Sequence, residues 1–212
     1  MKLRITKIAI FLAALIPLER LAWEAFHGGL GANPIEFITH STGDWTLIFV
    51  LTTLSITPLR RITRQYWLIG VRRMIGLFAF FYGCLHFTTY IWLDKFFDVH
   101  EMLKDIAKRP FITVGFSAFV LMIPLALTST AWSIRRLGGK NWLRLHRLIY
   151  LTGILGVVHY TWLVKADLRK PIEYGVVLGI LLLYRVGVWA SEKRKQSSIS
   201  APARSGVEVT KA

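Results

Sequence analysis

Two histidines lie deep inside apolar segments, where an ionisable side chain is rare enough to indicate a function. A helix rises about 1.5 Å per residue, so His86 lies about 18 Å beyond the start of its segment near Met74. By the same arithmetic, His159 lies about 19 Å beyond the start of its segment near His146. Two neutral imidazoles at matching depth on separate helices are the axial ligands that six-coordinate haem iron needs. We therefore predict that His86 and His159 ligate a haem.

Other roles for these two histidines have less support from the sequence. They could merely hydrogen-bond neighbouring helices. Zinc would need four ligands, and no carboxylate or thiol is placed to complete such a site. Cys84 is the one cysteine of the chain, which excludes a four-cysteine metal or iron–sulfur site within it. Covalent haem attachment is excluded because the chain has no C-x-x-C-H motif.

A third histidine, His146, stands at the start of the segment that carries His159, but off its helical face. A second haem with two histidine ligands would need another histidine near residue 72 or 73, where the chain has Arg72 and Arg73. Together with His146, these arginines could receive an anionic group such as a haem propionate or a flavin phosphate. Arg144 and Arg147 would belong to the same cluster. The alternative is that these arginines only meet lipid phosphates and fix topology, and the sequence leaves both open.

The segments that carry these residues belong to a membrane protein. The chain has 212 residues, 54% of them hydrophobic, a formal net charge of +15 and a mean hydropathy of +0.47. It is too apolar for a soluble nucleic-acid binder and too aromatic for a disordered chain. Six apolar segments approach the roughly 20 residues that cross a bilayer as a helix. They cover residues 5–25, 44–59, 74–93, 111–131, 147–164 and 172–190.

We thus predict an all-α integral membrane protein with a six-helix transmembrane bundle over residues 1–190. Most of the 27 Lys and Arg residues fall at the N-terminus, in two alternate connections and after the last segment, and most of the 12 acidic residues fall on the other side. Because cytoplasmic loops are enriched in basic residues, both termini are expected in the cytoplasm. The basic start before Ile8–Leu18 is also typical of a signal peptide, but no small-x-small site follows, so we expect a retained first helix.

Three further segments complete this prediction. Residues 27–43 form an outer loop that contains His27 and His40. Residues 96–109 have an apolar face at helical spacing and predict an interfacial helix on the outer side. Residues 191–212 are polar and are expected to be a disordered cytoplasmic tail.

These residues and motifs together resemble the MsrQ (YedZ) family, the haem-binding membrane subunits of a periplasmic methionine-sulfoxide reductase system, within the wider group that has a ferric-reductase-like transmembrane domain. The resemblance covers roughly residues 5–190. Its marks are His27-Gly-Gly-Leu-Gly-Ala-Asn-Pro34, Ile38-Thr-His-Ser-Thr-Gly43, Ile56-Thr-Pro-Leu-Arg60, Arg72-Arg-Met-Ile-Gly-Leu77 leading to Leu85-His86, Lys108-Arg-Pro-Phe-Ile-Thr-Val-Gly115, Leu127-Thr-Ser-Thr130, Trp142 to Leu145-His146, and His159-Tyr160.

The resemblance implies haem b held by His86, His159 and, less directly, His146. It also implies FMN, a location in the bacterial inner membrane, and a periplasmic molybdopterin-containing subunit that performs the sulfoxide chemistry. The chain would then be an electron conduit rather than an enzyme by itself, passing electrons from quinol or a cytoplasmic flavin reductase through flavin and haem to that subunit. The placement of the flavin at Arg72 and Arg73 is our inference from the residues.

Two rival functions remain. A ferric or oxygen reductase would need a separate flavin reductase chain, because the segment after residue 190 is short and has no G-x-G-x-x-G motif after a strand. A transporter or haem-delivery scaffold would be favoured by discontinuous helices or inverted repeats, which the sequence does not show.

Overall fold

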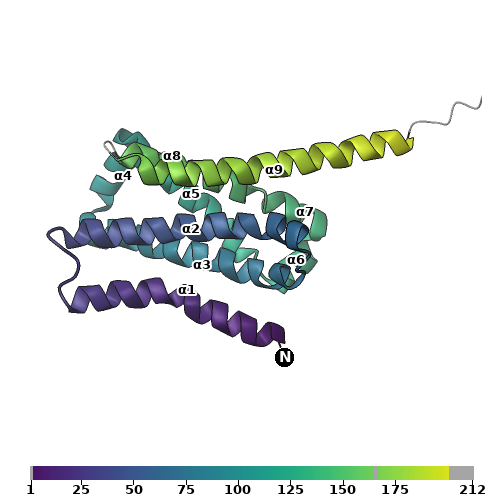
Figure 1. Cartoon of the computed structure of the whole chain (residues 1–212). Coiled ribbons are helices and arrows are strands. Elements are labelled where there is room, and N and C mark those ends of the chain that lie inside the picture. Colours follow the sequence, from purple (N-terminus) through teal and green to yellow (C-terminus); the bar gives the residue numbers. More distant parts are fainter. Residues whose placement is uncertain (1, 165–166, 201–212) are drawn as a thin grey trace, which may run out of the picture.

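The computed structural model describes residues 2–164 and 167–200, and the regular elements of these residues are helices, which confirms the all-α prediction for this part of the chain. Six long helices run side by side, with short helices at both ends of the bundle (Figure 1). The elements are α1 (Lys2–Phe26), α2 (Pro34–Thr63), α3 (Trp67–Thr89) with its π-helical extension η1 (Tyr90–Asp94), α4 (Val99–Lys108), α5 (Pro110–Leu127), α6 (Ala131–Leu137), α7 (Gly139–Leu145), α8 (Leu148–Leu163) and α9 (Arg169–Ser200).

Each of the six predicted segments lies mainly within one long helix. The predicted outer loop 27–43 is wrong in part, because α2 already begins at Pro34, where Asn33 caps it. Only part of the six-span prediction is supported. Three stretches of the described residues are long and apolar enough to cross a membrane: Trp67–Asp94, Pro110–Leu127 and Arg169–Gln196. Helix α8 has 16 residues and is therefore only about 24 Å long. Helix α1 carries Glu19, Arg20 and Glu24 in its second half. The spanning of α1, α2 and α8 remains a proposal.

The antiparallel pair α2 and α3 forms the centre of the bundle. Asn33 caps the start of α2 by accepting a hydrogen bond from the Glu36 amide, and Pro34 provides a first helical residue that needs no donor. At the other end Arg64 adopts a left-handed conformation (φ 58°) that ends α2, so that α3 can return beside it. The buried core lies mainly along this pair. The buried Tyr82 hydroxyl of α3 donates to the Ala14 carbonyl of α1 at 2.9 Å and ties the first helix to the centre.

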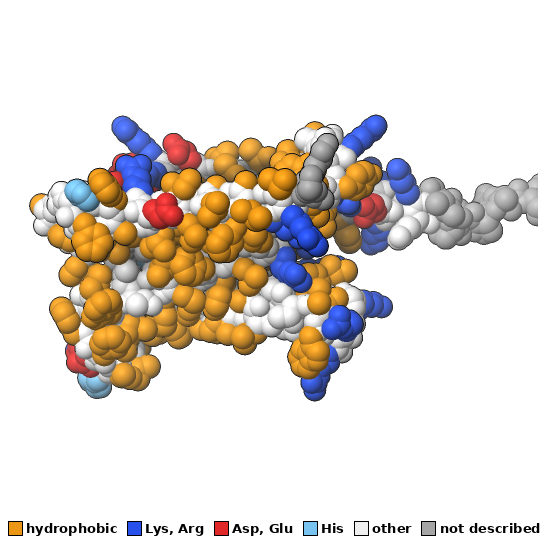
Figure 2. Space-filling view, turned by 90° about the horizontal axis from the view of Figure 1, so that it is seen from below, with side chains coloured by type: hydrophobic (Ala, Val, Ile, Leu, Met, Phe, Trp, Pro, Cys, Tyr) orange, Lys and Arg blue, Asp and Glu red, His pale blue; other side chains and the backbone are white. Residues whose placement is uncertain are grey.

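Basic side chains gather at one end of the molecule. We call this the basic end: it contains residues 60–73 and 131–147, together with the start of α1 and the last turns of α9 (Figure 1). Figure 2 shows Lys and Arg concentrated there, a broad apolar band in the middle, and a mixture of acidic, basic and His side chains at the opposite end. We call the opposite end the α4 end. This distribution is the one expected of a membrane protein with one cytoplasmic face.

The helix predicted over 96–109 is present as α4, but it begins at Val99, because Phe96 and Phe97 have positive φ values. Its location at the membrane interface stays a prediction. Its residues Val99 and Leu103 are exposed, whereas Ile106 on the same helix is partly buried. Asp105 is buried and forms ion pairs with Lys95 and, at 3.4 Å, with Arg109. These ion pairs attach α4 to both chain segments that flank it.

The C-terminal boundary differs from the prediction. Helix α9 continues through Lys193 and Gln196 to Ser200, past the expected end of the last segment at residue 190. Straight-chain Glu, Lys, Arg and Gln residues in this stretch favour helix, which polarity alone did not indicate. Residues 201–212 of the expected disordered tail lie outside the described residues.

Candidate cofactor site

A cavity of about 610 Å³ lies among α2, α3, α5 and α8. Its volume is within the range of small-molecule and cofactor sites, which is about 300–1,000 Å³. The part toward the middle of the bundle is lined by apolar and small residues such as Val50, Phe119 and Met122. The part toward the α4 end is lined by polar and charged residues, among them His40 and Arg109. The cavity is therefore apolar inside and polar at one mouth.

His86 of α3 and His159 of α8 both line this cavity and face one another across it. Their ring centroids are 6.1 Å apart, and the ring planes are inclined at 73°. The structure thus brings together the two histidines that the sequence placed at equal depth.

Backbone carbonyls fix the orientation of both rings. His86 Nδ1 lies 3.0 Å from the Thr39 carbonyl oxygen of α2, and His159 Nδ1 lies 2.7 Å from the Phe111 carbonyl oxygen of α5. A carbonyl can only accept, so Nδ1 carries the hydrogen in each ring. In a neutral imidazole this leaves the lone pair on Nε2, as in most metal-bound histidines whose other nitrogen is held by a backbone carbonyl.

Two glycines make room for the rings. A Cβ atom added at Gly115 of α5 would lie 2.6 Å from His159 Nδ1. One added at Gly43 of α2 would lie 3.1 Å from His86 Cε1. Each imidazole therefore packs directly against the backbone of a neighbouring helix, at a position where a side chain would displace it.

This geometry fits a haem. A metal held between two imidazole nitrogens at about 2 Å each would separate the ring centroids by roughly 6 Å. Within residues 2–164 and 167–200 no group of three or more His, Cys, Asp or Glu side chains could hold a metal ion without further ligands. A site of two axial imidazoles in an apolar cavity suits a metal whose remaining ligands come from a porphyrin.

A second cluster lies at the basic end. Arg72 of α3 is half-buried, donates to the Thr57 hydroxyl at 3.1 Å, and lies within electrostatic range of Arg60 and Arg185. Arg185 of α9 donates to the Tyr150 hydroxyl at 2.9 Å and to the Leu54 carbonyl at 2.8 Å. Three partly buried arginines with few acids around them form a region of positive potential that suits an anion.

His146 belongs to this cluster. Burial and the Arg72 guanidinium both lower the pKa of His146, so its neutral form is favoured. Its Nδ1 atom is buried and has no hydrogen-bond partner within the described part of the chain, and the same holds for Nε of Arg60 and of Arg185. Buried polar atoms without partners are rare, and here they surround one region. By contrast, Arg73, Arg144 and Arg147, which we grouped with His146 from the sequence, are exposed.

Several residues of both sites escaped the sequence analysis. Arg60 and Arg185 were assigned only to topology. Arg185 lies inside the predicted segment 172–190, and Arg60 directly follows the segment 44–59, so a basic residue in or beside an apolar segment could have indicated both. No sequence pattern indicated the roles of Gly43, Gly115 and the carbonyls of Thr39 and Phe111. These roles depend on which helices become neighbours. Outside both sites, Cys84 is half-buried, His100 is exposed, and His27 stacks on Trp23 with ring centroids 3.8 Å apart.

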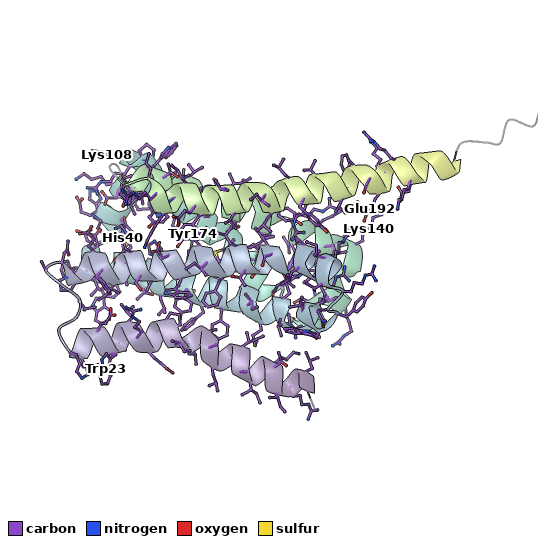
Figure 3. All side chains as sticks on the ribbon, in the orientation of Figure 1. Trp23, His40, Lys108, Lys140, Tyr174 and Glu192 are labelled. Atoms are coloured by element: carbon purple, nitrogen blue, oxygen red, sulfur yellow. The ribbon has the colours of Figure 1, made fainter. Side chains whose placement is uncertain are left out.

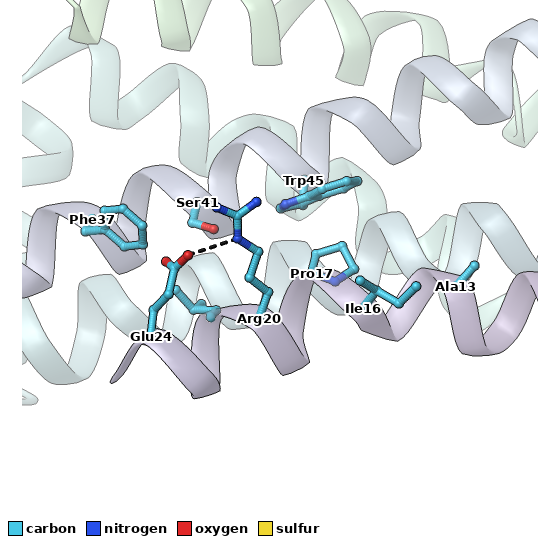
Figure 4. A pocket seen from close by; sticks show the side chains of 9 residues that line it. Ala13, Ile16, Pro17, Arg20, Glu24, Phe37, Ser41 and Trp45 are labelled. Carbon is cyan, nitrogen blue, oxygen red and sulfur yellow. Dashed lines mark hydrogen bonds and ion pairs between the residues drawn. The ribbon is translucent and has the colours of Figure 1, made fainter. Parts of the chain in front are cut away.

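A separate groove of about 420 Å³ lies between α1 and α2 (Figure 4). Apolar residues line most of it, and Arg20 points into it and forms an ion pair with Glu24 of the same helix at 2.9 Å. It is lined by residues 37, 41 and 45 of α2, whereas the cavity with the two histidines is lined by 36, 39, 40 and 43. One helix thus separates the two spaces, and none of the residues that line the groove is a histidine or cysteine.

Comparison with known proteins gives a consistent result. Residues 40–157 match the family described as ferric reductase like transmembrane component. The chain is 58% identical over 202 residues to the protein-methionine-sulfoxide reductase heme-binding subunit MsrQ of Herminiimonas arsenicoxydans, covering 94% of this chain and 92% of that one. It is 51% identical over 203 residues to the subunit of the same name from Ralstonia nicotianae, covering 95% and 93% of the two chains. No solved structure matches.

Proposed function

Because the chain belongs to the MsrQ family of heme-binding subunits, within the ferric reductase like transmembrane components, we propose that it is the electron-transfer cytochrome b of a methionine-sulfoxide reductase system. The observation that carries this proposal is the pair His86 and His159, with centroids 6.1 Å apart in an otherwise largely apolar cavity. In this proposal the chain is not catalytic alone, and a partner performs the sulfoxide chemistry.

We assign haem b to this cavity, where it would supply one-electron oxidation and reduction. The chain's own residues perform three tasks there. His86 and His159 would hold the haem iron through Nε2, the Thr39 and Phe111 carbonyls hold the two rings in place, and the apolar wall would exclude water. Such outer partners and apolar shells tune ligand basicity and redox potential.

The proposed topology has six membrane spans and both termini in the cytoplasm of a bacterium, with the chain in its inner membrane. The position of the N-terminus and of the last turns of α9 at the basic end supports this arrangement (Figures 1 and 2). Short spans such as α8 can cross if packed neighbours and interfacial aromatic residues assist. The α4 end then faces the periplasm, and segments 27–43 and 94–110 become the surfaces on which a periplasmic molybdopterin-containing subunit docks.

We propose that FMN binds at the basic end, with its phosphate near Arg72, His146 and the two arginines that accompany them. The buried and unpartnered nitrogens of Arg60, Arg185 and His146 support an anionic ligand there. Arg73 is exposed on α3 and has weaker support. Electrons would be supplied on this side, from quinol or from a flavin reductase. Lipid phosphates are the alternative anions for this cluster, and their phosphate chemistry is the same as that of FMN.

Cofactor quantification on the purified protein tests the proposal. Pyridine haemochrome and released flavin are measured on the same sample. We expect haem b that is present and not covalently attached. Protein that is saturated with neither cofactor, after expression with ample haem supply, would contradict the proposal. The second candidate, a ferric or oxygen reductase component, is favoured by the family match over residues 40–157. It predicts rapid reduction of ferric chelates by the haem-loaded protein and a flavin reductase, without a periplasmic subunit.

Replacing Arg72 with Gln is expected to weaken FMN binding roughly tenfold, because a charge-assisted hydrogen bond to phosphate contributes about 1.5–3 kcal/mol. Flavin fluorescence titration of the purified variant measures the change. The matched control is Arg135→Gln, which removes the same charge from an exposed position on α6. Equal FMN affinity in the two variants would argue that only the overall positive charge of this end matters.

A further inference from the structure

The cavity with the two histidines has only one polar end. Its inner wall is built mostly of apolar or small residues. The hydroxyls of Thr46 and Thr152 there already donate to the Thr42 carbonyl at 2.8 Å and to the Leu148 carbonyl at 3.1 Å. Its mouth at the α4 end carries all of the charged residues that line it. A haem brings two carboxylates, and burying an ionised carboxylate without a partner is costly. The carboxylates therefore have to face the mouth.

Two basic residues, apart from the proposed ligands, line this mouth: His40 and Arg109. Each is next to a carbonyl that orients a ligand. His40 follows Thr39, whose carbonyl holds His86, and Arg109 lies two residues before Phe111, whose carbonyl holds His159. These two side chains thus flank the pair of imidazoles from α2 and from the start of α5.

The acids at the mouth already have partners. Asp44 forms an ion pair with Lys170 at 2.8 Å, and Asp94 lies 3.6 Å from Lys95. Glu36 accepts a hydrogen bond from the Asn33 side chain at 2.8 Å. An acid that is paired with a lysine repels an incoming carboxylate much less than an unpaired one. The Asn33 amide leaves the charge of Glu36 in place, but the Glu36 side chain is largely exposed to solvent, which screens it.

Arg109 is less firmly paired than these acids. Its Nε atom lies 3.4 Å from Asp105, and the same carboxylate has a shorter ion pair with Lys95. About half of the Arg109 side chain is exposed at the cavity mouth, so the guanidinium can turn toward the cavity while Asp105 keeps its ion pair with Lys95. His40 is similarly loosely held, with Nε2 3.8 Å from Glu36. Arginine is also the side chain best suited to two-pronged binding of a carboxylate.

We infer that Arg109, assisted by His40, binds the propionates of the haem, so that the propionate edge of the cofactor faces the α4 end. This inference rests on the proposed placement of haem between His86 and His159. It gives α4 a role: through Asp105 and Ile106 it positions Arg109 and closes part of the mouth. It also places the polar edge of the haem toward segments 27–43 and 94–110.

The rate of haem loss tests the inference. Detergent-purified holoprotein is mixed with excess apomyoglobin, and haem transfer is followed by absorbance. We expect Arg109→Gln to lose haem roughly tenfold faster than the wild type, by the strength of a charge-assisted hydrogen bond. Arg109→Lys, which keeps the charge, should lie between the two. Lys108→Gln is the matched control: Lys108 is the neighbouring residue, exposed at the same end as His40, and does not line the cavity (Figure 3).

A second arm separates propionate binding from a structural effect. The proteins are reconstituted with haem dimethyl ester, which has no propionate charge, and the Arg109→Gln effect should then disappear. Equal loss rates for Arg109→Gln and Lys108→Gln with ordinary haem would overturn the inference, as would an equal acceleration with the ester. In either case a six-coordinate haem spectrum of Arg109→Gln would leave the proposed function intact. Wild-type protein that binds no haem would overturn both.

Discussion

Replacing either His86 or His159 with alanine is expected to abolish stable haem binding. Among the described residues, His86 and His159 are the two imidazoles that face each other across the cavity, with His40 at its mouth, so each substitution removes half of the proposed protein ligands. Loss of a mere outer-shell partner typically weakens metal binding 10–100-fold, and loss of an axial ligand should exceed that range. We therefore expect haem affinity to fall by more than about 100-fold in each single variant.

Pyridine haemochrome content and the reduced absorbance spectrum of the detergent-purified variants measure this prediction. His100→Ala is the matched control, since His100 is exposed on α4 and does not line the cavity. It should retain the full haem content and the wild-type spectrum. If His86→Ala and His159→Ala both keep the wild-type reduced spectrum, the ligand assignment is wrong. If only one keeps it, the iron is held by the other histidine and a residue elsewhere.

Gly115→Ala is expected to damage the same site without touching a ligand. The added Cβ would lie 2.6 Å from His159 Nδ1, closer than real atoms approach, and the neighbour is a ring held by the Phe111 carbonyl. His159 must therefore turn or α5 must move away from α8, and either change misplaces Nε2. Because a metal site needs its ligands positioned within about 0.5 Å, we expect at least a tenfold loss of haem affinity and a change from a six-coordinate spectrum.

Gly→Ala changes elsewhere provide the control. In a helix interior alanine is ordinarily more favourable than glycine by about 1 kcal/mol. Gly187→Ala on α9 meets nothing within 4 Å and should leave haem content unchanged. Gly43→Ala, with its Cβ 3.1 Å from His86 Cε1, should have an intermediate effect because a shift of a few tenths of an ångström would accommodate it. If the Gly115→Ala protein has wild-type haem content and a wild-type spectrum, α5 and α8 can move apart without displacing His159, and the prediction is wrong.

At the basic end, local sequence patterns predicted some residues of the cluster and missed others. Arg72 and His146 were predicted to share a site from their residue types and the direction of their helices, and the structure places them within electrostatic range. Arg73 was predicted with them but is exposed, because consecutive residues of a helix point about 100° apart. Arg185 joins the cluster from the far end of the chain, through contacts with Tyr150 and Leu54 that no local pattern indicates.

The sequence by itself determined the helices, the clustering of basic residues at one end, and the equal depth of His86 and His159. These properties follow from composition, from helical rise and from charge distribution, each of which acts along one segment at a time. The tertiary structure decided which faces meet. It turned both imidazoles toward one cavity and supplied the Thr39 and Phe111 carbonyls. It also made glycine necessary at residue 115 and left little room for a side chain at residue 43. Rotation of a helix about its axis is set by its neighbours, so the sequence of one helix alone could not specify it.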